Sequence, residues 1–365
     1  MADATRTRIL IMAGGTGGHV FPALAVADEL RSQGADVFWL GTRRGLEADV
    51  VPKANIDISF INVAGLRGKG LLGWLLAPLK LVYALWQGLN VMWRLKPRAV
   101  LGMGGFVTGP GGIAAWLARK PLLVHEQNAI SGLTNRLLAP FATTVMEAFP
   151  QSIAVGKAIH TGNPVRKDIA ALYESGEHES GQQPRPLHDP LHILVVGGSL
   201  GAKALNEVVP QALSGLGADK RPVVWHQTGK KNIDEARANY QQSGVEANVA
   251  AFIDDMAEAY RWADLVICRA GAMTIAELAI AGVASILVPY PYAVDDHQTS
   301  NAKYLTDKDA AVLIQQKDLT ADVLCQLLQE LTGNRLQKMA QAARALALPD
   351  ATRKVADKCL EAAHA

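Results

Sequence analysis

Short apolar runs alternate with stretches of helical periodicity in the first half of the chain. Residues 8–13 (RILIMA) have the pattern of a buried strand, and a glycine-rich turn leads from them into residues 19–33, where apolar side chains recur at helical spacing. Further strand-like runs occupy residues 36–41, 58–63, 99–104 and 121–126. Strands buried on both faces are typical of parallel sheets covered by helices, so this alternation predicts an α/β fold.

The same pattern restarts in the second half. Residues 171–190 are rich in Glu, Ser, Gly, Gln and Pro and predict a surface loop close to a domain junction. Residues 191–198 (LHILVVGG) then repeat the order of strand, glycine turn and helix. The repeat predicts two doubly wound, Rossmann-like domains that face a central cleft. We expect them at 1–164 and 165–346, with a last helix at about 347–365 that packs back on the first domain.

Composition supports two globular domains and separates them by charge. The chain has 365 residues, of which 49% are hydrophobic and 19% charged, which is enough apolar material for two cores. Residues 1–165 carry 16 basic and 9 acidic side chains (net +7), and the remainder carry 20 and 25 (net −5). The first half is therefore expected to face an anionic partner, either a membrane surface or a phosphorylated substrate. No Arg-rich tract or alternation of aromatic and basic residues indicates nucleic acid as a partner.

The cysteines and the start of the chain favour a reducing compartment. Cys268, Cys325 and Cys359 lack CxxC spacing and are odd in number, which predicts buried thiols and neither a disulfide framework nor a zinc site. The first fifteen residues run from a polar stretch into a strand without the apolar core of a signal peptide. The histidines show no ligand-like spacing, so no metal site is expected.

Three glycine-rich or small-residue turns join a strand to a helix. GGTGGH (14–19) and GGSLGA (197–202) suit the approach of an anion to backbone N–H groups, but neither is followed by the acid of a dinucleotide fingerprint, and no P-loop occurs. In CRAGAMTIAEL (268–278), Thr274 and the helix start suit a diphosphate, and Glu277 suits the hydroxyls of a ribose. The alternative is a capping Thr and a first-turn Glu that stabilise the helix.

Nine motifs occur in the order found in one enzyme family. They are GGTGGH (14–19), GLRGKG (65–70), GMGGFVTGPGG (102–112), HEQNAISGLTN (125–135), GNPVR (162–166), GGSLGA (197–202), FIDDM (252–256), CRAGAMTIAE (268–277) and DDHQTSNA (295–302). From about residue 8 to the final helix the chain resembles the MurG family. The resemblance implies a glycosyltransferase-B fold and an inverting hexosyltransferase of peptidoglycan synthesis. Such an enzyme moves GlcNAc from UDP-GlcNAc to the C4 hydroxyl of undecaprenyl-pyrophosphoryl-MurNAc-pentapeptide (lipid I) and gives lipid II.

The resemblance also implies roles for individual residues, with the donor bound by the second half and the acceptor by the first. Ile253 is expected at the uracil, Glu277 at the ribose, and His297 with Gln298 at the GlcNAc hydroxyls. The set expected to bind UDP-GlcNAc is Thr16, Gly17, Gly18, Asn128, Arg166, Ser199, Ile253, Ala272, Met273, Thr274, Ile275, Ala276, Glu277, His297 and Gln298. Within it, Thr16, Gly17 and Gly18 belong to a loop also expected beside the acceptor diphosphate. The acceptor-side loops contain Gly14, Gly15, Gly104 and Gly105.

The implied reaction needs a base for the C4 hydroxyl and a stabiliser for the departing UDP. His19 is the first candidate for the base because imidazole changes charge near neutral pH, and Glu126 is the second. The alternatives are that His19 only caps its helix and that Glu126 is a satisfied structural residue at a strand end. Helix N–H groups and Arg166 would stabilise the leaving group, so neither a metal ion nor another cofactor is expected.

Residues 71–93 form an apolar segment with one charge, Lys80, in 23 positions. A transmembrane span is rejected because it would separate strands 58–63 and 99–104, which the pattern places in one sheet. Basic flanks and aromatic side chains predict a helix lying in an anionic interface, although a core helix with an apolar stripe is the alternative. The expected membrane patch is Leu72, Trp74, Leu75, Leu79, Tyr83 and Trp86. The expected location is peripheral, on the cytoplasmic face of the bacterial inner membrane.

Two other functions fit parts of the pattern. A nucleotide-sugar 2-epimerase would share the two-domain fold and the UDP-sugar, but the basic apolar segment argues against it. A non-enzymatic subunit that recruits partners to a membrane would show degraded donor motifs, whereas the motifs of both halves are intact.

Overall fold

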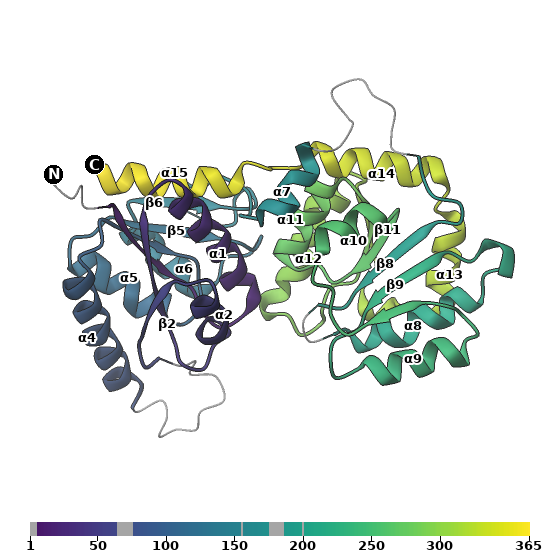
Figure 1. Cartoon of the computed structure of the whole chain (residues 1–365), viewed down its shortest axis with the longest axis horizontal. Helices are drawn as coiled ribbons and strands as arrows, with labels where there is room; N and C mark the ends of the chain where they lie inside the picture. The colour runs from purple at the N-terminus through teal and green to yellow at the C-terminus, as the bar shows by residue number, and fades with distance from the viewer. Residues whose placement is uncertain (1–5, 64–75, 155, 175–185, 199–200) are drawn as a thin grey trace. The chain divides into compact units, whose positions relative to one another are not determined.

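The structure is a computed structural model that describes residues 6–63, 76–154, 156–174, 186–198 and 201–365. The chain divides into two compact units, which are described separately (Figure 1). The first unit is Met1–Arg166 with Asp350–Ala365, and the second is Lys167–Pro349. The second unit therefore begins at residue 167 and the chain returns to the first unit at residue 350. The sequence predicted these two boundaries at residues 165 and 347.

The first unit is built on a parallel sheet in the order β3-β2-β1-β4-β5-β6-β7. Its strands are β1 (Arg8–Met12), β2 (Asp36–Gly41), β3 (Asp57–Phe60), β4 (Ala99–Gly102), β5 (Leu122–Glu126), β6 (Thr144–Glu147) and β7 (Ile159–His160). The register places Ile11 between Trp39 of β2 and Leu101 of β4. The order reverses between β1 and β4, and such a switch point is where open α/β sheets bind their ligands, at the carboxyl ends of the strands.

Helices cover both faces of this sheet, as the apolar runs predict. The helical segments are α1 (Gly17–Ser32), α2 (Glu47–Lys53), α4 (Ala77–Leu95), α5 (Thr108–Leu117), α6 (Leu133–Leu138), the 3-10 turn η1 (Ala139–Phe141) and α15 (Ala351–His364). Side chains alternate along β1, so that Ile9 and Ile11 join a core with α1 and α15, while Leu10 and Met12 join a core with α4 and α5. The side chains of Ile9 to Met12 are fully buried in these two cores. This packing holds β1, the strand that leads into the glycine turn, in place.

Helix α15 is distant in sequence from the rest of the first unit but belongs to its core. Val355, Ala356 and Cys359 are fully buried in the same cluster as the inner face of α1. The hydroxyl of Thr352 donates to the carbonyl oxygen of Val165 at 2.8 Å and accepts from its N–H at 3.0 Å. Helix α15, labelled in Figure 1, therefore packs on one face of the sheet that the first part of the chain forms.

The second unit is a second parallel sheet, in the order β10-β9-β8-β11-β12-β13. Its strands are β8 (His192–Val196), β9 (Val223–Gln227), β10 (Asn248–Ala250), β11 (Leu265–Cys268), β12 (Ala284–Leu287) and β13 (Ala311–Leu313). Its helices are α7 (Lys167–Glu174), α8 (Lys203–Ser214), α9 (Ile233–Gln242), α10 (Met256–Trp262), α11 (Ala272–Ala281), α12 (His297–Thr306), α13 (Ala321–Glu330) and α14 (Gly333–Ala345). The 3-10 turns are η2 (Ala218–Lys220), η3 (Val294–Asp296) and η4 (Gln316–Asp318). The prediction of two doubly wound α/β domains is confirmed.

The predicted last helix, at about 347–365, corresponds to α15 (Ala351–His364), and a separate helix, α14, precedes it. Helix α14 ends at Ala345, and α15 begins at Ala351 after Pro349, which belongs to the segment between them. Proline lacks the N–H of a helix interior and restricts the residue before it, so a break there is expected physically. The three cysteines are free thiols, and Cys268 and Cys359 are buried.

Candidate active site

The first candidate site lies at the carboxyl ends of β1, β4 and β5. The loop after β1 leads into α1, whose first turn contains His19, and the residue directly after β5 is Gln127. Nδ1 of the half-buried His19 lies 3.0 Å from Oε1 of the buried Gln127. A histidine at this edge is thus held by a residue 108 positions later in the chain.

Two glycines make this packing possible. Gly104 has a φ of +103°, and a Cβ atom there would lie 2.7 Å from Nδ1 of His19. Gly105 has a φ of +86°, and a Cβ atom there would overlap the carbonyl oxygen of Gly14. Only glycine combines this backbone conformation with such close approach. The two loops that were expected to face the acceptor are therefore in direct contact with each other.

Glu47 organises the glycine loop, and the sequence analysis did not identify it. Its carboxylate is fully buried, and Oε2 accepts the N–H of Gly15 at 2.9 Å. Oε1 accepts the N–H of Thr42 at 2.9 Å and the Thr42 hydroxyl at 2.8 Å. In the sequence this residue resembles any acid in the first turn of a helix, so no local signal marks its role.

Glu126 is satisfied by the loop that follows it. Oε1 accepts the N–H of Asn128 at 2.9 Å and its side-chain amide at 3.3 Å. Oε2 accepts the N–H of Gly132 at 3.1 Å and the side-chain amide of Asn135 at 2.9 Å. Because the carboxylate is buried and its oxygens point to these donors, the geometry favours the structural alternative for Glu126 and leaves His19 as the better candidate for the base.

His125 is a buried, neutral neighbour of this loop. Its Nε2 atom lies 3.0 Å from the carbonyl oxygen of Gly162. Burial lowers the pKa of His125 to about 4, against the smaller opposing effect of that hydrogen bond. The imidazole is therefore uncharged at neutral pH. Arg166, which the resemblance also implicates, is exposed at the end of the first unit.

The second candidate site lies at the start of α11 in the other unit. Gly271 caps the helix with extended backbone, and the first helical hydrogen bond runs from the N–H of Ile275 to the carbonyl of Gly271. Residues 272–274 therefore form the N-terminal turn, whose N–H groups and positive dipole end suit an anion. Thr274 lies in this turn, whereas the side chain of Ile275 is in the core. A role of Ile275 in binding would be a role of its backbone.

Glu277 is held one turn further along α11. Its Oε2 atom accepts the hydroxyl of Tyr260 at 2.9 Å. Its charge also acts on Cys268 at the end of β11: burial, and secondly the negative charge of Glu277, raise the pKa of this thiol to about 12. Glu277 therefore lies near the carboxyl end of β11, and its role as a ribose ligand stays a prediction.

The GGSLGA turn and the predicted donor residues Ser199, Ile253 and Gln298 lie beyond the ends of strands in the second sheet. Gly198, which has a φ of +79°, donates its N–H to Oε1 of Gln227 at 3.2 Å, and its carbonyl accepts from Nε2 at 3.0 Å. Ser199 lies outside the described residues. Ile253 is buried in the segment after β10, so a contact with uracil would use its backbone. Oε1 of Gln298, in the first turn of α12, accepts the N–H of Tyr290 at 2.9 Å.

His188, His192 and Asp264 form a cluster that the spacing of histidines did not indicate. One ligand atom from each lies within 4.8 Å of the others. Asp264, however, accepts the backbone N–H groups of both histidines, at 3.2 and 2.8 Å. The two rings stack with centroids 3.8 Å apart, so their in-plane lone pairs do not converge on one point. Asp264, directly before β11, is thereby linked to the start of β8 and to the segment that precedes it.

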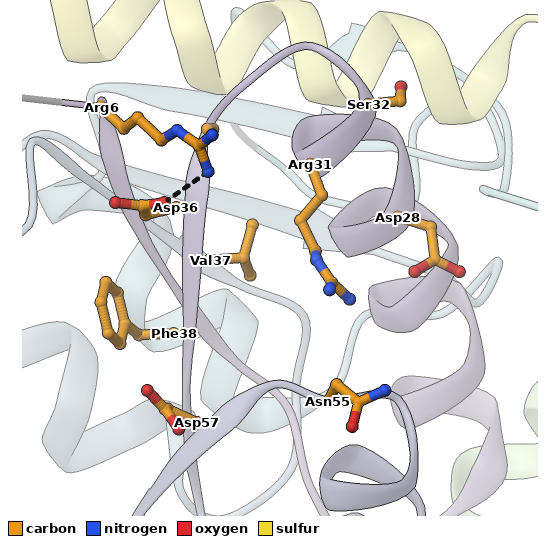
Figure 2. A pocket seen from close by; sticks show the side chains of 10 residues that line it. Arg6, Asp28, Arg31, Ser32, Asp36, Val37, Phe38, Asn55 and Asp57 are labelled. Atoms are coloured by element: carbon orange, nitrogen blue, oxygen red, sulfur yellow. Dashed lines mark ion pairs between the residues drawn. The ribbon is translucent and has the colours of Figure 1, made fainter. Parts of the chain in front are cut away.

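A hollow of about 760 Å³ lies in the first unit, and Figure 2 shows the side chains that line it. It is lined by the end of α1 and by the starts of β2 and β3, so it lies at the amino ends of the strands of the first sheet. Its side chains carry both charges, and Arg6 forms an exposed ion pair with Asp36 at 3.7 Å. None of the predicted site residues lines it.

Most of each unit matches one of the two domains of a glycosyltransferase family. Residues 9–147 match the glycosyltransferase family 28 N-terminal domain, and residues 192–357 match the C-terminal domain. Two relatives, from Nitrosococcus oceani and Marinobacter nauticus, are named UDP-N-acetylglucosamine–N-acetylmuramyl-(pentapeptide) pyrophosphoryl-undecaprenol N-acetylglucosamine transferase. The first is 55% identical and covers 98% of this chain and 99% of its own, and the second is 52% identical over the whole of both. The chain belongs to the MurG family.

Solved structures agree with membership of the MurG family. The Acinetobacter baumannii MurG is 43% identical and covers 97% of this chain and 99% of its own, with a TM-score of 0.81. A UDP-GlcNAc 2-epimerase from Neisseria meningitidis has a TM-score of 0.66 at 13% identity, which is a likeness of fold alone. The family resemblance and the glycosyltransferase-B fold are confirmed, and the chain is a hexosyltransferase.

Proposed function

We propose that this protein transfers GlcNAc from UDP-GlcNAc to the C4 hydroxyl of lipid I, giving lipid II for peptidoglycan synthesis and so serving cell shape and division. The observation that carries the proposal is the near full-length identity of 52–55% to relatives with this name. The two sites built above are the chemical support. Glu277 and the N-terminal turn of α11 suit a nucleoside diphosphate, and His19 suits a proton acceptor.

The proposed mechanism assigns the proton and the leaving group to different residues. His19 accepts the proton of the acceptor's C4 hydroxyl. The oxygen of that hydroxyl attacks the anomeric carbon of GlcNAc from the side opposite UDP, and this attack inverts the linkage. The bond to UDP breaks with its electron pair on the diphosphate. The N–H groups of residues 272–274 and the charge of Arg166 stabilise that developing charge. The mechanism assigns no step to a metal ion or another cofactor.

We also propose that the first unit binds an anionic membrane surface through α4. Among the described residues, no helix is long and apolar enough to cross a bilayer. Helix α4 nevertheless exposes an apolar stripe at helical spacing: Leu79 (68% exposed), Val82 (65%), Tyr83 (50%), Trp86 (55%) and Trp93 (61%). Of the expected patch, Leu79, Tyr83 and Trp86 lie in this stripe, and Leu72, Trp74 and Leu75 lie outside the described residues.

The opposite face of α4 packs into the core, so the exposed stripe is not the face that holds the helix in place. Ala84, Gly88, Val91 and Met92 are buried against α5. A Cβ atom on Gly88 would come within 3.0 Å of Ala114, so the two helices pack closely. The neighbouring segments α5, α6 and η1 also expose apolar side chains, which are Trp116, Leu117, Leu133, Leu137 and Phe141. Four basic side chains are exposed on α4, α5 and α6 or just beyond them: Lys80, Arg94, Arg119 and Arg136. Such a surface suits a peripheral protein on the cytoplasmic face of the inner membrane.

The test of the proposed function is transfer of labelled GlcNAc from UDP-GlcNAc to an undecaprenyl-pyrophosphoryl-MurNAc-pentapeptide, with EDTA present. We expect transfer by the wild type, a raised KM for the donor in Glu277→Ala, and a kcat lowered by roughly 100-fold or more in His19→Ala. Release of UDP with epimerised sugar and no transfer would support the epimerase instead. Loss of wild-type transfer on adding EDTA, restored by a divalent metal, would contradict the metal-independent mechanism.

A further inference from the structure

A chain of hydrogen-bonding groups runs from a backbone carbonyl to the imidazole of His19. The carbonyl oxygen of Gly162 lies 3.0 Å from Nε2 of His125, and Nδ1 of His125 lies 3.2 Å from Nε2 of Gln127. Oε1 of Gln127 lies 3.0 Å from Nδ1 of His19. All four residues belong to the first unit, and His125 and Gln127 are buried.

The direction of each hydrogen bond follows from the chemistry of its ends. A carbonyl oxygen only accepts, so Nε2 of His125 carries the proton. His125 is neutral at physiological pH because burial lowers its pKa, so its Nδ1 atom has a lone pair and accepts. The group of Gln127 that faces it is therefore the NH₂ group.

A second acceptor fixes the same orientation of the Gln127 amide. Nε2 of Gln127 lies 3.2 Å from the carbonyl oxygen of His125, which also only accepts. The amide oxygen must then face His19. Since that oxygen accepts, Nδ1 of His19 is the donor, and the neutral imidazole keeps its lone pair on Nε2. Within the described part of the chain, no hydrogen bond is made to Nε2 of His19.

We propose that Gln127 is a positioning residue that holds His19 in the tautomer protonated on Nδ1, so that Nε2 takes the acceptor proton. A histidine side chain without such a partner carries its proton mainly on Nε2, which would place the lone pair on the nitrogen that faces Gln127. Proton uptake at Nε2 gives an imidazolium whose Nδ1–H still points to the amide oxygen. The catalytic part of this inference rests on the proposed function, but the tautomer is a property of the protein without substrates.

The first test is ¹⁵N NMR of the full chain labelled at histidine, at mildly alkaline pH, with His19→Gln to identify the His19 signals. We expect a protonated Nδ1 and an unprotonated Nε2 in the wild type. Gln127→Met removes the acceptor and shifts His19 towards the Nε2–H form. Gln127→Glu keeps an acceptor at this position and retains the Nδ1–H form. Ser152→Ala, which removes a buried hydrogen bond to Glu147 elsewhere in the same unit, leaves the signals unchanged.

The second test is steady-state transfer by the same variants. We expect Gln127→Met to lower kcat by roughly 100-fold with an unchanged KM for UDP-GlcNAc, and Gln127→Glu to stay within about tenfold of the wild type. Both substitutions remove the N–H donor to His125. If Gln127 had only a structural role, both variants would therefore lose the same amount of kcat, and that result would overturn the proposal. A wild-type His19 protonated on Nε2 would also overturn it. If the wild type transfers no GlcNAc, the proposed function fails, while an Nδ1–H signal would still support the tautomer assignment.

Discussion

The phenolic hydroxyl of Tyr260 donates a hydrogen bond to Oε2 of Glu277 over 2.9 Å. Tyr260 is buried on α10, and Glu277 is half-buried on α11. The hydroxyl therefore restricts the position of the carboxylate that we propose as the ribose ligand. We predict that Tyr260→Phe raises the KM for UDP-GlcNAc roughly tenfold with little change in kcat, because a hydrogen bond to a charged group is lost.

Initial rates at varied UDP-GlcNAc measure this effect. Tyr304→Phe is the matched control, because it removes a hydroxyl that donates to the carbonyl of Leu346 in the same unit. Equal donor KM values for Tyr260→Phe and the wild type would contradict the positioning of Glu277 by Tyr260.

Glu126→Gln should act on stability. One carboxylate oxygen becomes an NH₂ group that faces N–H donors in the loop of residues 128–135, so buried donors lose their acceptor. We predict a loss of about 2–4 kcal/mol in the free energy of unfolding of the first unit. Urea unfolding measures it, and His19→Ala, which removes a half-buried side chain, should lose less. A fully stable but inactive Glu126→Gln would instead favour Glu126 as the base.

Glu47→Gln should loosen the glycine loop after β1. The substitution leaves either Gly15 or Thr42 without its acceptor. We predict a lower melting temperature and a raised KM for the lipid acceptor, with the KM for UDP-GlcNAc unchanged. Asp49→Asn, at an exposed position of the same helix, is the control. Identical acceptor kinetics in the two variants would show that Glu47 does not support the loop.

Two buried histidines should make the fold less stable in mild acid. Burial lowers the pKa of His125 to about 4 and that of His226 to about 3. Both values lie below the unfolded value of about 6.5, so below that pH the unfolded chain binds protons that the folded chain does not. Their contribution to stability is therefore complete above about pH 6.5 and is lost as pH falls towards the folded values.

The expected slope is up to ~1.4 kcal/mol per pH unit for each histidine. The melting temperature should fall as the pH is lowered from neutral to about pH 4. In His226→Gln, the melting temperature of the second unit should fall less steeply with pH than in the wild type. A melting temperature that stays constant from neutral pH to about pH 4 would contradict the neutral, buried state of both side chains.

Val82→Glu combined with Trp86→Glu should weaken membrane binding. Both side chains are more than half exposed on α4, so the changes add charge to the apolar stripe without entering the core. Co-sedimentation with anionic vesicles should fall, and wild-type binding should fall at high salt. Val323→Glu, at an exposed position of α13, is the control. Unchanged binding of the double variant would place the membrane contact elsewhere.

The order of strands and helices was predictable because parallel strands buried on both faces are continuous apolar runs. The glycine turn before His19 and the helix start before Glu277 were also found, because each follows such a run. The contact of His19 with Gln127 was not predictable, because it depends on β4 lying between β1 and β5. Local sequence patterns do not determine the order of strands in a sheet. Glu47 was missed for the same reason: its partners are the ends of two neighbouring strands.

The position of α15 has a consequence for how the chain folds during synthesis. Val355, Ala356 and Cys359 fill a core whose other members begin at Ile9, so the ribosome has made nearly all of the sequence before that core is complete. The second unit, Lys167–Pro349, is continuous and has all its strands before α15 is made. We therefore expect the second unit to complete its folding first. The first unit would keep one apolar face of its sheet exposed until α15 has been synthesised.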